Sequence, residues 1–154
     1  MTRTDTASRL IRADAQRVFA ALLDAAALTE WLIPNGMTGH FEEFDARPGG
    51  SYRLVLTYEE GSAGMGKATP ESDIVEVRFL DIVPNVRVAQ AVDFVSEDPA
   101  FAGTMEMTWE LDPQDDRTHV TIRAENVPRG IGAKEHRVGL NASLAQLASF
   151  LDRE

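Results

Sequence analysis

The sequence predicts an α+β fold in which a curved antiparallel sheet of about six to seven strands wraps around a long C-terminal helix. Three observations predict this fold. Segments between residues 37 and 126 alternate apolar with polar side chains, as strands with one solvent-exposed face do. Two short helical patterns precede these segments, and one longer helical pattern follows them.

The segment from Leu10 to Asp24 begins with a short extended piece and continues as a helix. Asp14 is placed to cap this helix, because an aspartate side chain accepts a hydrogen bond from a free backbone N–H of the first turn. Asp24 is placed to cap a second short helix, which Pro34 and Gly36 close. Apolar side chains recur along the two helices at Val18, Phe19, Leu22, Leu23, Ala25, Leu28 and Trp31.

Four segments show the strand alternation most clearly. Successive side chains of a strand point to opposite faces, so the apolar members are expected on one buried face. These members are Tyr52, Leu54, Leu56, Tyr58, Val75, Val77, Phe79, Met105, Met107, Trp109, Leu111, Val120, Ile122 and Ala124. Turns are expected at Pro84-Asn85 and from Pro113 to Asp116. The polar, glycine-rich connection from Glu59 to Asp73 is expected to be a mobile loop near a binding site.

The last helix is expected to run from about Lys134 to the end of the sequence. Its apolar stripe consists of Leu140, Leu144, Leu147 and Leu151, at helical spacing. This stripe is expected to cover the apolar face of the sheet, which is larger than one helix can fill. The sequence therefore predicts a pocket between the sheet and the last helix.

Composition and charge bound the function. A chain of 154 residues fits one domain, spanning residues 1–154, and it contains no cysteine for disulfides or thiolate chemistry. The formal net charge of −10 argues against nucleic acids and anionic membranes as partners. No run approaches the ~20 apolar residues of a membrane helix, so we expect a cytoplasmic protein. A homodimer is compatible with this composition.

Cofactor motifs are not found in the sequence, and we expect neither a cofactor nor a metal. The three histidines His40, His119 and His136 do not have the i, i+4 spacing of a helical zinc site. The segment from Gly61 to Lys67 lacks the Ser or Thr that completes a phosphate-binding loop, because Ala68 follows. No serine lies in a G-x-S-x-G motif, and we assign no catalytic residue.

A set of residues spread from about Ser8 to Leu151 forms a recognisable pattern. It comprises Val18-Phe19, Trp31, Pro34, Gly36, Phe44-Asp45-x-Arg47-Pro48-Gly49-Gly50, Glu76 to Phe79, Thr108-Trp109, His136, Gly139-Leu140 and Ser143-Leu144. This pattern resembles the SRPBCC superfamily, and within it the branch of activator of heat-shock-protein ATPase homologue-like proteins. The resemblance implies a helix-grip fold with a largely apolar cavity between the sheet and the last helix. The family commonly has Gly-Trp where this chain has Gly139-Leu140, and the smaller side chain widens the cavity unless other residues fill the space.

The segment Asp45-Ala46-Arg47-Pro48-Gly49-Gly50 is interpreted as a corner before the strand that begins near Ser51, since its glycines adopt angles that other residues resist. Within it, Arg47 is the candidate polar contact for a ligand. His136, near the start of the last helix and the expected pocket mouth, is a candidate general base or hydrogen-bonding group. The predicted ligand-binding residues are Trp31, Tyr52, Leu54, Phe79, Met105, Met107, Trp109, His136, Leu140 and Leu144.

The sequence leaves three functions open. The first is a domain that binds a small hydrophobic or aromatic molecule in an internal cavity, and the sequence favours it over catalysis. The second is a polyketide cyclase-like or hydrolase-like enzyme, with His136 carrying a proton and Arg47 or Tyr52 orienting the substrate. The third, implied by the resemblance, is a protein-binding module similar to chaperone ATPase activators.

Overall fold

The computed structural model of the protein describes residues 3–33, 36–58 and 72–152. Seven antiparallel strands form one sheet in the order β1-β7-β6-β5-β4-β3-β2. They are β1 (Thr4–Ile11), β2 (Met37–Glu42), β3 (Ser51–Tyr58), β4 (Ser72–Val83), β5 (Arg87–Phe94), β6 (Met105–Gln114) and β7 (Arg117–Glu125). The helices are α1 (Ala15–Leu23), α2 (Ala25–Trp31), α3 (Ala133–Asp152) and a short 3₁₀ helix, η1 (Pro99–Phe101). The predicted α+β fold is confirmed.

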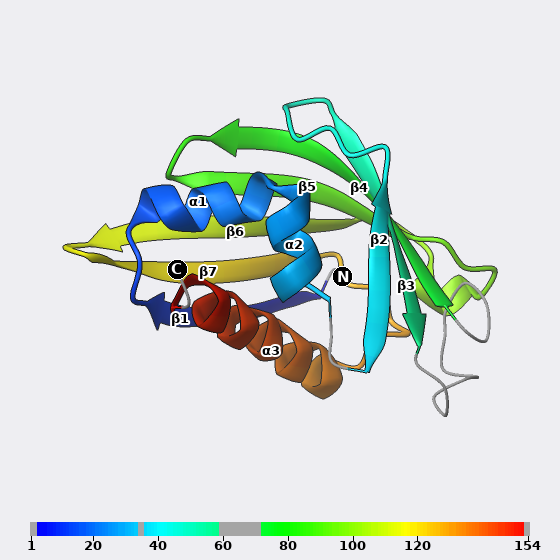
Figure 1. Cartoon of the computed structure of the whole chain (residues 1–154). Helices are drawn as coiled ribbons and strands as arrows, with labels where there is room; N and C mark the ends of the chain where they lie inside the picture. The colour runs from blue at the N-terminus through cyan, green and yellow to red at the C-terminus, as the bar shows by residue number, and fades with distance from the viewer. Residues whose placement is uncertain (1–2, 34–35, 59–71, 153–154) are drawn as a thin grey trace.

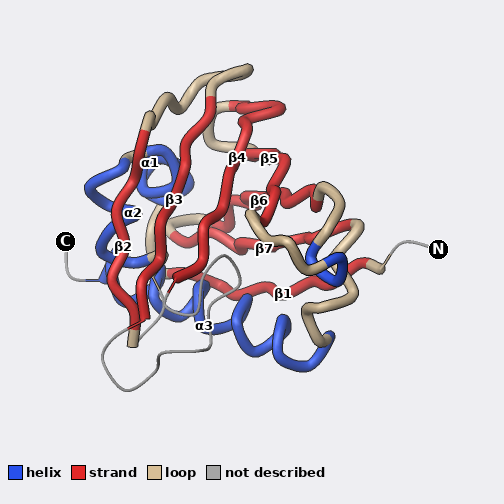
Figure 2. Tube along the Cα trace, turned by 90° about the vertical axis from the view of Figure 1, so that its right-hand side faces the viewer, coloured by secondary structure: helices blue, strands red, loops and turns tan. Residues whose placement is uncertain are grey.

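The sheet is strongly curved, and α1, α2 and α3 lie on its concave side (Figure 1). In Figure 2, β2, β3 and β4 run across the direction of β6, β7 and β1, which shows how far the sheet bends. The register between β4 and β5 shifts between Phe79 and Asp81, an irregularity of the kind that increases the bend of a strand. The helices therefore sit inside a curved wall.

Both predicted caps are present. The Asp14 side chain accepts a hydrogen bond from the backbone N–H of Arg17 at 2.9 Å, and Asp24 accepts one from Ala26 at 3.1 Å. Trp31, at the end of α2, donates its indole N–H to the carbonyl of Ala21 at 3.0 Å. These bonds fix α2 across the end of α1, so the Trp31 ring is held inside the core with 1% exposure.

The stripe on α3 is buried as predicted: Leu140, Leu144, Leu147 and Leu151 are each 5% exposed or less. Gln146, on the same helix, donates to the carbonyl of Trp31 at 2.6 Å and to that of Ile33 at 3.1 Å. The last helix is therefore packed against the sheet and bonded to the end of α2. None of the helices in the described ranges is long and apolar enough to cross a membrane.

The segment from Asp45 to Gly50 is a corner, as the sequence predicts. Gly50 donates its backbone N–H to the carbonyl of Arg47 at 2.7 Å, and Asp45 donates to the carbonyl of Ser51 at 2.9 Å. Gly49 has φ +83°, a left-handed conformation that glycine adopts without strain. The backbone N–H of Gly49 donates to the carbonyl of Phe79, and the N–H of Phe79 donates to the carbonyl of Gly50, both at 2.9 Å. These two hydrogen bonds attach the corner to β4.

Some expectations fall outside the described residues. Pro34 is one of them, and so is the connection from Glu59 to Glu71, with its glycine-rich segment around Lys67. The predicted end of that loop, at Asp73, is wrong. Strand β4 already begins at Ser72, and Asp73 is a buried strand residue. Asp73 pairs with Leu56 of β3, so sheet pairing overrides the polar character of the segment.

Candidate ligand-binding cavity

A cavity of about 290 Å³ lies between the inner face of the sheet and the helices. Strands β3 to β6 supply one wall, while Leu22 of α1, residues of α2 and one face of α3 supply the other. Its volume is at the small end of the range for ligand pockets. The curvature of the sheet leaves this space because the helices cover only part of the concave face.

The lining is largely apolar. Its polar members are Tyr52, Gln90, His136 and Ser143. The Tyr52 hydroxyl and the Gln90 side chain are hydrogen-bonded to each other, and both residues are buried, with exposures of 6% and 7%. Among the residues that the structure describes, no Lys, Arg, Asp or Glu lines the cavity. The walls are therefore suited to an uncharged, mostly apolar molecule.

Most of the predicted ligand-binding residues border this space. The structure places Trp31, Tyr52, Leu54, Met105, Met107, Trp109, His136 and Leu140 in its lining. Phe79 and Leu144 do not line it. Phe79 is 1% exposed and packs against the rings of Phe44 and Tyr52, and Leu144 is fully buried one helical turn beyond Leu140. Strand and helix periodicity finds the inward side chains, but it does not separate those that border a void from those that are packed on every side.

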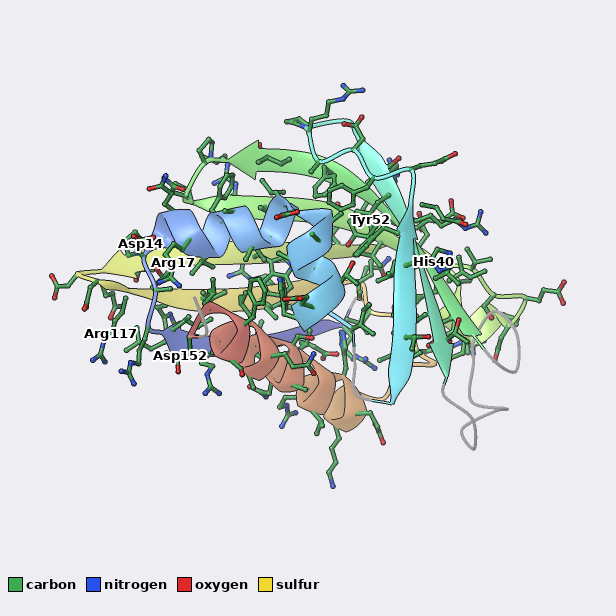
Figure 3. The ribbon with its side chains drawn as sticks, in the orientation of Figure 1. Asp14, Arg17, His40, Tyr52, Arg117 and Asp152 are labelled. Atoms are coloured by element: carbon green, nitrogen blue, oxygen red, sulfur yellow. The ribbon has the colours of Figure 1, made fainter. Side chains whose placement is uncertain are left out.

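Arg47 does not reach the cavity. Its side chain is 70% exposed and its Nε atom lies 2.7 Å from the Asp45 carboxylate, within the corner. The second hypothesis needed His136, Arg47 and Tyr52 at one site, and the structure brings together only His136 and Tyr52. His40 is not part of the cavity either, because it lies on the side of β2 away from the helices (Figure 3). Tyr52, on the neighbouring strand β3, does line the cavity.

Two residues beside His136 were not predicted from the sequence. The Nδ1 atom of His136 lies 2.7 Å from Asp5 Oδ2, and Arg3 donates to the same carboxylate oxygen at 3.0 Å. Both residues come from β1 and its start, where Arg3, Asp5 and Ala7 are partly buried and Thr4 and Thr6 are exposed. The sequence carries a signal for this placement, because Arg3 and Asp5 have the same strand parity as the apolar Ala7 and Ile11 and so fall on the same face.

His136, Gly139 and Phe94 also border a second, outer groove. The other wall of that groove is formed by residues around η1 and the segment before α3, among them Phe101 and Ile131. Because these three residues are shared, we take this part of the boundary as the mouth of the cavity. His136 and Gly139 lie three residues apart on α3, and therefore on one face of the helix.

Gly139→Ala is expected to raise the free energy of unfolding by about 0.5–1 kcal/mol, because a glycine inside a helix loses more backbone entropy than an alanine does. A Cβ at Gly139 meets no atom within 4 Å, so no clash opposes the gain. Urea unfolding measures it. Ala142→Gly, at an exposed position of the same helix, should lower stability by a similar amount. A loss of stability in Gly139→Ala would contradict the open geometry of the mouth.

Tyr52→Phe is expected to lower stability at neutral pH by about 1–3 kcal/mol, because Gln90 loses its buried partner. Burial raises the pKa of Tyr52 above its ordinary value of 10.0, although the hydrogen bond with Gln90 acts the other way. The stabilisation from the neutral phenol is complete below pH 10 and is lost as the pH rises further. Above pH 10, the difference in the free energy of unfolding between the unmodified protein and Tyr52→Phe should narrow by roughly 1.4 kcal/mol per pH unit. Urea unfolding at a series of alkaline pH values measures this difference. A gap that stays constant would contradict the raised pKa.

A curved antiparallel sheet closed by a long C-terminal helix around an apolar cavity defines a helix-grip protein of the SRPBCC superfamily. The chain belongs to the family of activator of Hsp90 ATPase homolog 1-like proteins, whose family model matches residues 12–152. The resemblance noted in the sequence is thereby confirmed.

Solved structures show the same fold. Protein CV1439 from Chromobacterium violaceum is 29% identical, with a TM-score of 0.85 over 97% of this chain and 96% of that one. Protein Mll3558 from Rhizobium loti is 26% identical, with a TM-score of 0.75 over 97% of each chain. DynU16, a putative protein in the dynemicin biosynthetic locus, is 17% identical, with a TM-score of 0.68 over 97% of this chain and 47% of its own. No curated protein matches the chain.

Proposed function

We propose that the protein binds a small hydrophobic or aromatic molecule in the cavity between the sheet and α3. The observation that carries the proposal is the apolar space of about 290 Å³ inside a domain of 154 residues. Water in a space with a largely apolar lining finds few hydrogen-bonding partners, which favours an apolar ligand over water there. A ligand that fills it would recover dispersion contacts and keep water out.

One observation favours a second function, a cyclase-like or hydrolase-like enzyme that uses the same cavity. The imidazole of His136 borders the space and is oriented by Asp5, an arrangement suited to proton transfer. Arg47, the substrate-orienting group of that hypothesis, lies outside the cavity, so binding is the function that we propose first. The third hypothesis, a chaperone ATPase-activating module, rests on the family name alone, and the cavity gives it no support. The cytoplasmic location remains a prediction from the sequence.

The two tryptophans provide a direct test. Trp31 and Trp109 are the only tryptophans in the sequence, both line the cavity, and their rings meet edge to face at 5.5 Å. A molecule bound between the walls would change the surroundings of both indoles, so titration with cyclohexane, which neither absorbs nor emits where tryptophan does, should change tryptophan emission in a saturable way. Emission that stays unchanged, or that falls without saturation, would count against an accessible cavity.

A further inference from the structure

His136, the charged-type side chain in the cavity lining, is hydrogen-bonded behind the wall to the first strand. His136 of α3 and Asp5 of β1 are joined at 2.7 Å, and their side chains are only 12% and 10% exposed. Arg3 donates to the same carboxylate and to the carbonyl of Ile131, just before α3. Three ionisable side chains thus form one chain of hydrogen bonds that ends at the cavity.

The hydrogen bond to Asp5 decides which nitrogen of His136 carries the proton. Burial raises the pKa of Asp5, but the hydrogen bonds from His136 and Arg3, with the positive charge of Arg3, lower it overall below its ordinary value. Asp5 is therefore a carboxylate at neutral pH and only accepts hydrogen bonds, so Nδ1 of His136 is the donor. In the neutral imidazole Nε2 is then a hydrogen-bond acceptor.

Nε2 is the ring nitrogen of His136 that remains available to a ligand, because Nδ1 is bonded to Asp5 of β1 and the residue borders the cavity. Within the described parts of the chain, Nε2 forms no hydrogen bond. Two other polar members of the lining, Tyr52 and Gln90, already bond to each other. The wall therefore presents an oriented acceptor in mostly apolar surroundings.

The charge balance selects the group that meets this acceptor. Arg3 already offsets the charge of Asp5, and no Lys or Arg side chain lines the cavity among the residues that the structure describes. A carboxylate ligand would have to lose its hydration with only a protonated His136 to compensate, which is costly in apolar surroundings. A hydroxyl group needs only one acceptor, and a weakly acidic hydroxyl forms the stronger bond with an imidazole.

We propose that the ligand is an apolar ring-containing molecule bearing a phenolic or enolic hydroxyl, and that this hydroxyl donates its hydrogen to Nε2 of His136. Asp5 and Arg3 act as positioning residues, since they fix the tautomer and the orientation of the ring. This assignment rests on the proposed function and adds to it the chemical class of the ligand.

The experiment compares two probes of one shape, 2-naphthol and 2-methylnaphthalene, which differ by a hydroxyl in place of a methyl group. Equilibrium dialysis against the unmodified protein should give a dissociation constant about tenfold lower for 2-naphthol. 2-Naphthoate should bind more weakly than 2-naphthol at slightly alkaline pH. In His136→Phe the preference for 2-naphthol should disappear while 2-methylnaphthalene still binds.

Asp5→Asn separates positioning from packing. The asparagine keeps the volume of the aspartate but no longer fixes the tautomer, so Nε2 can carry the hydrogen and cease to accept. The preference for 2-naphthol should fall severalfold in Asp5→Asn, whereas the affinity for 2-methylnaphthalene stays near that of the unmodified protein. If Asp5 were only structural, Asp5→Asn would lower the affinity for both probes by the same factor.

The outcomes distinguish this inference from the proposed function. If neither probe binds the unmodified protein, the cavity is not a ligand site and both ideas fail. If the two probes bind equally well, or if 2-naphthoate binds most tightly, the hydroxyl assignment is overturned and ligand binding stands. The comparison of the probes uses the unmodified protein, so it tests the hydroxyl assignment even if a variant fails to fold.

Discussion

Replacing Leu140 by Trp is expected to weaken the binding of 2-methylnaphthalene at least tenfold and to leave the fold intact. Leu140 is 5% exposed and forms part of the cavity wall on α3. An indole at this position extends into the space that a ligand would occupy, so ligand and side chain compete for the same volume. Stability should be kept or raised, because the larger side chain fills an apolar void.

Equilibrium dialysis with the probe measures the affinity, and urea unfolding measures the stability. Val138→Trp is the matched control, since Val138 is 63% exposed on the same helix and a Trp there adds the same ring outside the cavity. This control should bind the probe like the unmodified protein. Undiminished affinity in Leu140→Trp would show that the probe binds elsewhere.

Gly50→Ala is expected to lower the free energy of unfolding by about 2–4 kcal/mol, the largest effect of a single methyl group that the structure suggests. A Cβ at Gly50 would lie 2.2 Å from the carbonyl oxygen of Asp45 and 3.0 Å from that of Arg47. Both are backbone atoms of the corner, so relief requires the chain to move. That movement would disturb the hydrogen bonds that Gly50 makes to Arg47 and Phe79.

Gly49→Ala is the control in the same corner. Its φ is +83°, but a Cβ there meets no atom within 4 Å, so the cost is the conformational strain of about 1–2 kcal/mol alone. Chemical denaturation of the two variants under one condition ranks the steric and conformational contributions. If Gly49→Ala proved the more damaging, the close approach of Gly50 to Asp45 would be refuted.

The secondary structure could be predicted because its signals are local. The caps at Asp14 and Asp24 need only a side chain and the next few backbone amides, and both were found where expected. The corner could be interpreted for the same reason, since the hydrogen bonds from Gly50 to Arg47 and from Asp45 to Ser51 join residues close in sequence. The start of β4 was missed because the pairing of Asp73 with Leu56 depends on the neighbouring strand.

The site was less accessible to sequence reasoning. Inward positions such as Met107 and Phe79 follow the same alternation, yet only Met107 borders the cavity, because aromatic rings from other segments pack around Phe79. The pairing of Asp5 with His136 joins residues 131 positions apart. No spacing rule reaches that far, and the two residues meet only because α3 packs against β1 in the folded protein.

The position of β1 in the sheet bears on how the chain folds as it leaves the ribosome. Within the described sheet, β1 is hydrogen-bonded only to β7, so residues 4–11 have no partner strand until residues 117–125 have been synthesised. Asp5 gains its hydrogen bond with His136 later still, because His136 belongs to α3, which follows β7 in the chain. Long-range pairing of this kind slows folding and leaves strand edges open meanwhile. The cavity can therefore close only after α3 has been synthesised, because His136, Leu140 and Ser143 of that helix form part of its lining.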